Sequence, residues 1–377
     1  MKKFSKIILV AAIVASTSVT YAQHLPQINN RPLMPESWLL GTGQTWFYKV
    51  NASSQGRILG QRDPNSGETA TVNEIQRIFD KLPSMALLLG DGDKIVKLNF
   101  KSPANDYSTF MSASIDKTVT AMSTGVAICD GKIKLTTKVK EVLPEFSNKD
   151  IGESTLRDNL MMSNGTKDAF SDSQSLTKEQ LNNLMTGKSS LMDFMKGPLG
   201  DFAFWSKPGK FSYKSQDPII TGMMVSAAYG KNGKDFREWQ DEHFFTKVQT
   251  GERRIHGRDQ FGYAWTEGNT RMTIKDWARF AIFVQESRKK NDCYGDFVRE
   301  ATTTQIKSNK QFAPMYDGYG YFTWTDNNQV PNTYSAIGYG GQSIVWSSVN
   351  DKYLIIFSTS VIIQEVHSIA KLWLESK

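Results

Sequence analysis

Two strand-turn-strand patterns, one near each end of the chain, constrain the fold most strongly. Residues 85–100 are rich in strand-forming apolar residues around the turn Gly90–Asp93, and residues 343–357 repeat this arrangement around Val349–Asp351. Apolar residues at helical spacing occupy residues 114–130, 218–229, 273–285 and 361–376. Terminal strands around a helical middle predict an α+β fold, in which N- and C-terminal segments form an antiparallel sheet that is flanked by helices and carries a helical insertion.

The length of 377 residues allows two average domains or one large catalytic domain. Hydrophobic residues make up 39% and charged residues 22%, which is a composition able to bury a sizeable core. The pattern along the chain favours one large unit. We expect an N-terminal targeting segment over residues 1–22, an irregular lead-in with one weak helix over residues 23–84, and a single domain over residues 85–377. The helical subdomain is expected within about residues 131–300.

The first residues are typical of an export signal. Lys2, Lys3 and Lys6 precede an apolar run over residues 7–19, and small residues follow up to Ala22. We predict cleavage after Ala22 and a periplasmic or secreted protein without stable membrane insertion. An uncleaved anchor is the alternative, but the run is shorter than the roughly 20 apolar residues of a spanning helix. Removing three lysines lowers the net charge from +7 to 7 − 3 = +4, so we expect no nucleic-acid partner.

The cysteines and histidines limit the chemistry. Cys129 and Cys293 allow a single disulfide, which an oxidising compartment permits, but Cys129 lies in an apolar helical pattern and a buried free thiol fits equally well. The histidines have no spacing typical of metal ligands. They are His24, His243, His256 and His367. We therefore expect no metal and no cofactor.

Ser114 and Lys117 are the best candidates for catalysis. Three residues apart on a helix, they share one face, so the lysine amine reaches the serine hydroxyl. A partly desolvated lysine gives up its proton more easily and serves as a base toward serine. The same spacing recurs at Ser175–Lys178, Ser287–Lys290 and Ser368–Lys371. Ser114 differs because it follows the first hairpin and begins an apolar helix, whose N-terminal dipole favours an oxyanion.

The chain here resembles the serine beta-lactamase-like superfamily. That superfamily includes class C beta-lactamases, D-alanyl-D-alanine carboxypeptidases, esterases and 6-aminohexanoate-dimer hydrolases. The resemblance spans roughly residues 85–357 and rests on the succession of segments after the first motif. These segments are Ser114-x-x-Lys117, Asp130-Gly131-Lys132-Ile133-Lys134-Leu135, Val142-Leu143-Pro144-Glu145 and residues 155–165. It implies a beta-lactamase/transpeptidase-like fold.

The resemblance also indicates a second and a third motif. The second, usually Tyr-x-Asn, matches Tyr213-Lys214-Ser215, with serine in place of asparagine. The third, usually Lys-Thr-Gly or His-Thr-Gly, matches Tyr339-Gly340-Gly341, followed by Gln342. The family then implies that Ser114, Lys117 and Tyr213 are catalytic, and that the backbone N–H groups of Ser114 and Gln342 bind the oxyanion. A glycine-rich turn that merely enters a strand is the alternative for the third motif.

The departures from the family pattern bear on the substrate. Tyr339 replaces the cation that would hold a substrate carboxylate, which favours an esterase or amidase acting on small esters or linear amides, similar to 6-aminohexanoate-dimer hydrolases. A D-alanyl-D-alanine carboxypeptidase or class C-type beta-lactamase is the alternative, and a non-catalytic cell-wall or beta-lactam binding protein is the other class. The expected partner is thus a small molecule, and the sequence carries no signal for an oligomeric state.

Further residues are candidates for the cleft. Aromatic side chains are expected to line it, although packing in the core explains them equally well. They are Trp205, Tyr263, Trp265, Tyr319, Tyr321 and Trp324. Arg253, Arg254 and Arg258 are expected to form a solvated basic loop, with gripping of a substrate carboxylate as the alternative.

Overall fold

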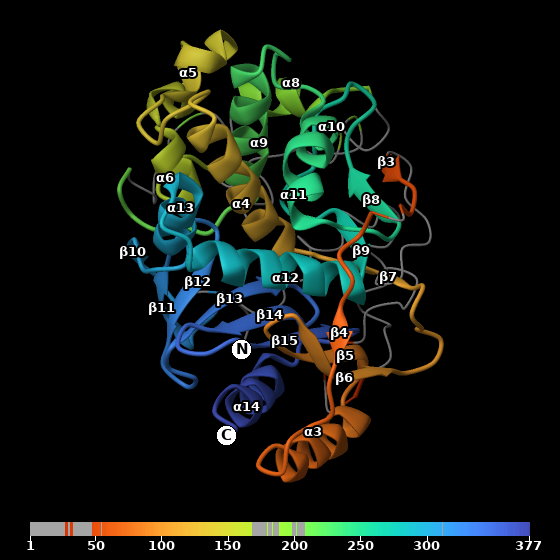
Figure 1. Cartoon of the computed structure of the whole chain (residues 1–377). Coiled ribbons are helices and arrows are strands. Elements are labelled where there is room, and N and C mark those ends of the chain that lie inside the picture. The colour runs from red at the N-terminus through yellow and green to blue at the C-terminus, as the bar shows by residue number, and fades with distance from the viewer. Residues whose placement is uncertain are drawn as a thin grey trace.

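The computed structural model describes residues 27–28, 31–32, 47–53, 55–167, 179, 183, 188–197, 201, 208–310 and 312–377. The expected targeting segment, residues 1–22, lies outside these residues. The described chain forms one large sheet, with helices on both of its faces, and a helical region beyond one of those faces (Figure 1). Within the described residues, no helix combines the length and apolarity that crossing a lipid bilayer requires.

The large sheet joins the two ends of the described chain. Its strands follow in space the order β10 (Ile306–Lys307), β11 (Tyr316–Tyr319), β12 (Trp324–Asn327), β13 (Thr333–Gly338), β14 (Gln342–Ser347), β15 (Lys352–Ser358), β5 (Ser84–Asp91), β6 (Lys94–Phe100) and β4 (Gly60–Gln61). The pairs are antiparallel, as predicted, except that β4 runs parallel to β6. Both predicted hairpins are confirmed as β5–β6 and β14–β15.

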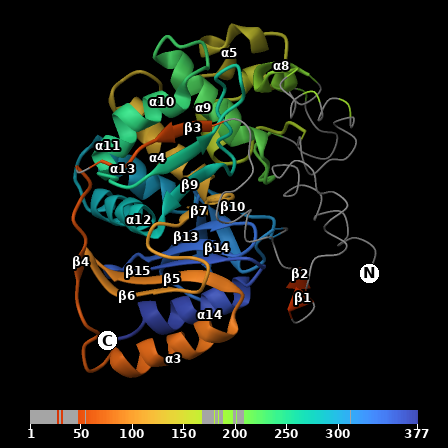
Figure 2. The same cartoon turned by 90° about the vertical axis from the view of Figure 1, so that its right-hand side faces the viewer.

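Helices cover the two faces of the large sheet (Figure 2). Alternation along β5 explains why both faces need cover, because successive side chains point to opposite sides of a sheet. Leu87 and Leu89 pack in the core formed with α3 (Thr69–Lys81) and α14 (Ile363–Leu374), whereas Leu88 belongs to the core on the other side. There, the long helix α12 (Ile274–Arg288) lies against the sheet and packs its Trp277 on Phe357.

Beyond α12 lies the helical region, which also contains a smaller sheet. The smaller sheet has the order β3 (Phe47–Val50), β8 (Arg254–Gly257), β9 (Thr270–Thr273) and β7 (Thr109–Met111), and β1 (Gln27–Ile28) pairs with β2 (Arg31–Pro32). The helical segments here are α4 (Ile115–Cys129), α5 (Val139–Val142), η2 (Pro144–Phe146), η3 (Asp150–Glu153), α6 (Leu156–Leu160), α8 (Leu191–Lys196), α9 (Gln216–Ala228), α10 (Phe236–Gln240), η5 (Asp241–Phe245), α11 (Thr246–Val248) and α13 (Cys293–Ala301). The predicted helices over residues 114–130, 218–229 and 273–285 are confirmed as α4, α9 and α12.

The expected lead-in contributes to the main sheet. Residues 60–61 form β4 at its edge, and residues 69–81 form α3, a helix of 13 residues rather than a weak one. Val72, Ile75 and Phe79 of α3 are buried against the sheet and α14. The structural unit therefore begins upstream of the expected boundary at residue 85.

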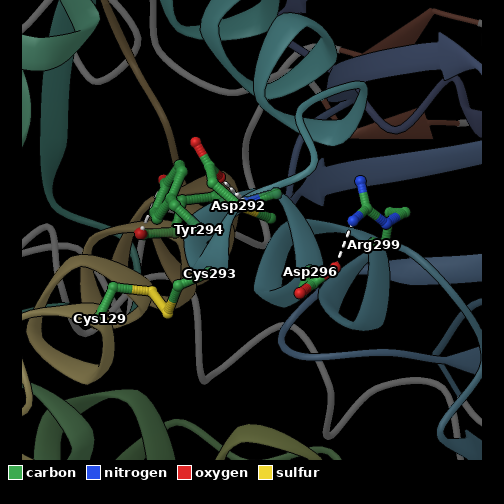
Figure 3. The surroundings of a disulfide bond; sticks show 8 residues. Cys129, Asp292, Cys293, Tyr294, Asp296 and Arg299 are labelled. Atoms are coloured by element: carbon green, nitrogen blue, oxygen red, sulfur yellow. Dashed lines mark hydrogen bonds and ion pairs between the residues drawn. A yellow bond between two sulfur atoms is a disulfide. The ribbon is translucent and has the colours of Figure 1, made fainter.

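A disulfide ties α4 to α13 (Figure 3). Cys129, the last residue of α4, is bonded to Cys293, the first residue of α13, which decides against the free thiol. The two helices also approach closely at Gly125, where a Cβ atom would come within 2.3 Å of the Phe297 ring. Tyr294 adds a hydrogen bond from its hydroxyl to the Met122 carbonyl at 3.0 Å.

Replacing Cys293 by Ser is expected to lower the free energy of unfolding by about 2–5 kcal/mol, because the disulfide closes a loop of 164 residues in the unfolded chain. Chemical denaturation of wild type and C293S, each with and without reductant, measures the loss. Reductant is expected to bring the wild type down to the level of C293S and to leave C293S unchanged. Equal stability of oxidised wild type and C293S would contradict the prediction.

Candidate active site

Ser114 lies where the smaller sheet leads into α4. The Ser112 N–H donates to the Thr270 carbonyl at 2.8 Å, which fixes the segment that enters the helix. Ala113 has a φ of 42°, and non-glycine residues with such strained backbone cluster at active sites. Ser114 is the N-cap residue of α4, but its hydroxyl makes no capping hydrogen bond to the helix. The Ser114 Oγ is therefore available to a side chain.

Lys117 supplies that side chain. Its Nζ donates to Ser114 Oγ at 3.0 Å and to the Glu267 carbonyl at 2.8 Å. Lys117 is only 2% exposed, because α4 is buried along almost its whole length. The predicted contact between the lysine and the serine thus exists, in a partly desolvated place where a lysine is suited to act as a base.

The other Ser-x-x-Lys pairs differ from this one. Ser287 is buried while Lys290 is exposed to solvent. Ser368 and Lys371 are both exposed on α14, and the Ser368 hydroxyl donates to the Gln364 carbonyl instead. The fourth pair, Ser175–Lys178, lies outside the described residues.

Tyr213 lies beside Lys117, while its predicted catalytic role stays a prediction. The Lys117 Nζ is 5.1 Å from the centre of the Tyr213 ring. The ring stacks on Trp324, with centroids 5.5 Å apart, and also contacts Phe312 and Tyr319. These contacts hold the half-buried tyrosine in place next to the lysine. Ser215, two residues further along, is the N-cap residue of α9.

A turn at residues 267–269 forms hydrogen bonds with two residues in the first turn of α4. The Glu267 carbonyl accepts from Lys117, and the Asn269 N–H donates to Asp116 Oδ2 at 3.0 Å. Asp116 also forms a fully buried ion pair with Arg237 of α10 at 2.7 Å. Arg237 in turn donates to the Trp265 carbonyl. Asp116 and Arg237 thereby connect α4, α10 and the turn under the nucleophile.

The Glu267 side chain is also buried. It is 5% exposed, and burial raises the pKa of its carboxyl to about 7, against the opposing effect of the Lys117 charge. The Asn269 side chain donates to Glu267 Oε1 at 3.2 Å. A group that titrates near neutral pH thus lies within the electrostatic reach of the lysine.

The third candidate motif forms the turn between β13 and β14. Gly340 and Gly341 have φ values of 81° and 83°, which glycine adopts without strain. Gln342 begins β14, and its buried carboxamide is bonded to the Ser358 backbone and the Tyr339 carbonyl. Burial raises the pKa of the half-buried Tyr339. The glycine-rich segment thus forms the turn between the two strands, and its assignment as the third motif stays a prediction.

This turn lies next to the nucleophile segment. Gly338, which pairs with Gln342 at the end of β13, approaches Ser112 so closely that a Cβ atom there would lie 2.4 Å from the Ser112 carbonyl oxygen. The strand end therefore abuts the residues that precede Ser114. The role of the Gln342 N–H as an oxyanion donor stays a prediction.

Comparison with known proteins places this arrangement in a family. A sequence model named Beta-lactamase matches residues 72–372, which is most of the chain. The chain belongs to the Beta-lactamase family. As a member, it is a serine hydrolase with the predicted beta-lactamase/transpeptidase-like fold. No curated protein matches it in sequence.

Solved structures agree on this fold. The chain is similar to a candidate 6-aminohexanoate-dimer hydrolase from Bacillus anthracis, with a TM-score of 0.71 and 14% identity over 90% of this chain and 92% of that one. A candidate beta-lactamase from Bacteroides dorei gives a TM-score of 0.61 and 17% identity over 80% and 98% of the two chains. A penicillin-binding protein from Bacillus halodurans gives 0.61 and 16% identity over 78% and 98%.

The aromatic residues expected to line the cleft of this Beta-lactamase-family protein have different places. Tyr319 and Trp324 contact Tyr213 but are themselves buried, so they pack against this residue of the site and do not line a cleft. Tyr321 belongs to the core, where its ring packs on Phe297. Tyr263 is buried, Trp265 is half-buried, and Trp205 lies outside the described residues.

The expected solvated basic loop is wrong for one of its three arginines. Arg253 is exposed and Arg258 is half-buried in an ion pair with Glu238. Arg254, however, is 4% exposed and forms an ion pair with Asp241. It lies on β8 of the smaller sheet, a strand whose four residues are all buried.

Sequence reasoning missed four residues at the base of the site. They are Asp116, Arg237, Glu267 and Gly338. The sequence does mark Asp116, because a charged residue within an apolar helical pattern is buried and then requires a partner of opposite charge. The sequence does not mark Glu267, since 150 residues separate it from the lysine that it contacts.

Proposed function

We propose that the protein is an exported serine hydrolase that cleaves a small ester or linear amide through an acyl-enzyme on Ser114. The hydrogen bond from Lys117 Nζ to Ser114 Oγ at 3.0 Å carries the proposal, because it brings a buried amine to the nucleophile. The position of the Tyr213 ring beside Lys117 supports Tyr213 as the third member of a proton relay.

The proposed reaction has two halves. Ser114 Oγ attacks the substrate carbonyl carbon, and its proton passes to Lys117 and Tyr213. Tyr213 then protonates the leaving alcohol or amine as its bond to the acyl carbon breaks. Water next attacks the acyl-enzyme, gives a proton to the same relay, and releases the acid while Ser114 Oγ recovers its proton.

The position of Ser114 at the N-terminus of α4 supports stabilisation of the tetrahedral intermediate. The positive end of the helix dipole favours a negative oxygen there. We propose the N–H groups of Ser114 and Gln342 as the two donors. The approach of β13 to Ser112 supports this, because it brings the start of β14 near the nucleophile segment.

Tyr339 supports an uncharged or weakly polar substrate end. It stands where relatives of the carboxypeptidase and beta-lactamase type carry a cation, and it offers a hydroxyl and an aromatic face instead. We therefore favour esters and linear amides over beta-lactams and peptide carboxylates.

The disulfide between Cys129 and Cys293 supports export, because such bonds persist in oxidising compartments.

Labelling with a fluorophosphonate tests the nucleophile. Folded wild-type protein is expected to gain one adduct by intact mass, at Ser114, because the lysine activates that hydroxyl. Absence of an adduct would favour a non-catalytic binding protein.

A comparison of the hydrolysis rates of p-nitrophenyl butyrate and nitrocefin then separates the substrate classes. Rapid hydrolysis of nitrocefin without hydrolysis of the ester would contradict the preference for esters.

A further inference from the structure

The Glu267 carboxyl is a buried titratable group for which the proposed reaction has no use. Its Oε1 accepts from Asn269, while Oε2 is buried without a hydrogen-bond partner among the described residues. A buried carboxylate oxygen without a donor is costly unless a nearby charge compensates it or the group holds a proton. Either outcome links Glu267 to its charged neighbours.

The charged groups that act on this carboxyl, within the described part of the chain, are Lys117 and Asp116 of α4 and Arg237 of α10. Asp116 and Arg237 already neutralise each other in their buried ion pair. Asp116 also accepts hydrogen bonds from the Thr270 hydroxyl and the Asn269 N–H, which satisfies it further. Among these three groups, Lys117 is therefore left to respond to the charge of Glu267. On its other side Lys117 faces the Tyr213 ring.

A hydrogen bond to the backbone keeps Lys117 beside residue 267. Lys117 Nζ donates to the carbonyl of Glu267 itself, so the lysine cannot move away from this residue without losing a hydrogen bond. The carboxyl is on the same residue and is held by Asn269 within the same turn. An opposite charge within about 4–6 Å of a buried group shifts its titration by about one unit or more.

We propose that Glu267 is a positioning residue that sets the pH at which Lys117 becomes a competent base. When Glu267 is an anion, it favours the ammonium form of Lys117; when its charge is removed, Lys117 releases its proton at lower pH. This inference rests on the proposed role of Lys117 as the base. Burial supports it, since it raises the pKa of Glu267 to about 7, where the carboxyl changes charge near neutral pH.

Glu267→Gln tests the proposal, because glutamine keeps the shape of the side chain and an acceptor for Asn269 but removes the charge. The rising limb of kcat/KM against pH for p-nitrophenyl butyrate is expected to lie about one pH unit lower in E267Q than in wild type. A purely structural role for Glu267 would lower the rate without moving the limb. An unchanged limb, or one moved to higher pH, would overturn the proposal.

Asp259→Asn is the matched control. Asp259 is also buried, with a pKa that burial raises, but it accepts hydrogen bonds from the backbone N–H groups of Leu191, Phe261 and Tyr263 instead. In D259N, the rising limb of kcat/KM against pH is expected to coincide with that of wild type. A limb that moves equally in D259N would show that any buried carboxyl has this effect, which would also overturn the proposal.

A second measurement needs no turnover. It follows the reciprocal effect, which is the influence of the Lys117 charge on the titration of the Glu267 carboxyl. In protein labelled with ¹³C at glutamate side-chain carboxyls, the resonance missing from E267D belongs to Glu267. Lys117→Met is expected to move the titration of this resonance to higher pH by about one unit, because the cation that favours the carboxylate is gone. An unmoved titration would overturn the proposal even if E267Q failed to fold. The S114A variant tests the proposed reaction separately, so failure of one is distinguishable from failure of the other.

Discussion

The Ser114→Ala variant is expected to lose at least about 10³-fold in kcat/KM for p-nitrophenyl butyrate. Alanine removes the Oγ that Lys117 contacts at 3.0 Å, and hence the atom on which the acyl-enzyme forms. The neighbouring groups keep their places, because the Ser114 hydroxyl makes no capping bond to α4. Steady-state kinetics at fixed pH measures the loss, and unfolding curves show that S114A remains folded.

Ser368→Ala is the control for this loss. Ser368 has the same spacing to a lysine, Lys371, but is exposed on α14 and bonds to the Gln364 carbonyl. Its removal is expected to leave the rate unchanged. Full ester hydrolysis by S114A would show that the acyl-enzyme forms elsewhere or not at all.

The second large effect is on stability. Asp116→Asn is expected to lower the free energy of unfolding by about 3–5 kcal/mol, because it leaves the Arg237 guanidinium buried without an opposite charge. Both side chains of the pair are fully buried, so water cannot compensate the loss. For a chain of this size, such a change lowers Tm by roughly 5 °C. Thermal unfolding followed by circular dichroism measures it.

Asp351→Asn is the matched control, since Asp351 pairs with Lys289 at the surface, where about half of each side chain is exposed. Exposed ion pairs contribute about 0–1 kcal/mol, so D351N is expected to unfold close to the wild-type temperature. The interpretation of Asp116 as the counter-charge of Arg237 is wrong if D116N and D351N unfold at the same temperature.

Sequence patterns sufficed wherever the determining contacts are local. Ser114 and Lys117 meet because three positions of one helix bring them together, and the hairpins form around short turns that the sequence marks clearly. The α3 helix is longer and better packed than its sequence predicts. Its helical interior includes β-branched residues such as Val72 and Ile75, and its stability depends on packing against α14.

The rest of the site depends on contacts between distant segments. Glu267 reaches Lys117 through a turn 150 residues further along, and no local pattern marks that turn. Aromatic residues gave no guidance either, because Tyr319 next to Tyr213 and Tyr321 beside Phe297 are two positions apart and have similar sequence surroundings. The pairing of Cys129 with Cys293 needed the packing of α4 on α13 to be known.

The pairing of β5 with β15 brings together two segments from opposite ends of the chain. Leu88 lies opposite Ile355, so the centre of the main sheet is complete only after almost the whole chain has been made. Contacts between such distant residues make folding slow. Before β15 is made, β14 and β5 lack the strand that lies between them, so the main sheet is incomplete. If the proposed export takes place before folding, the chain is expected to be inactive while it crosses the membrane, because its main sheet forms only afterwards.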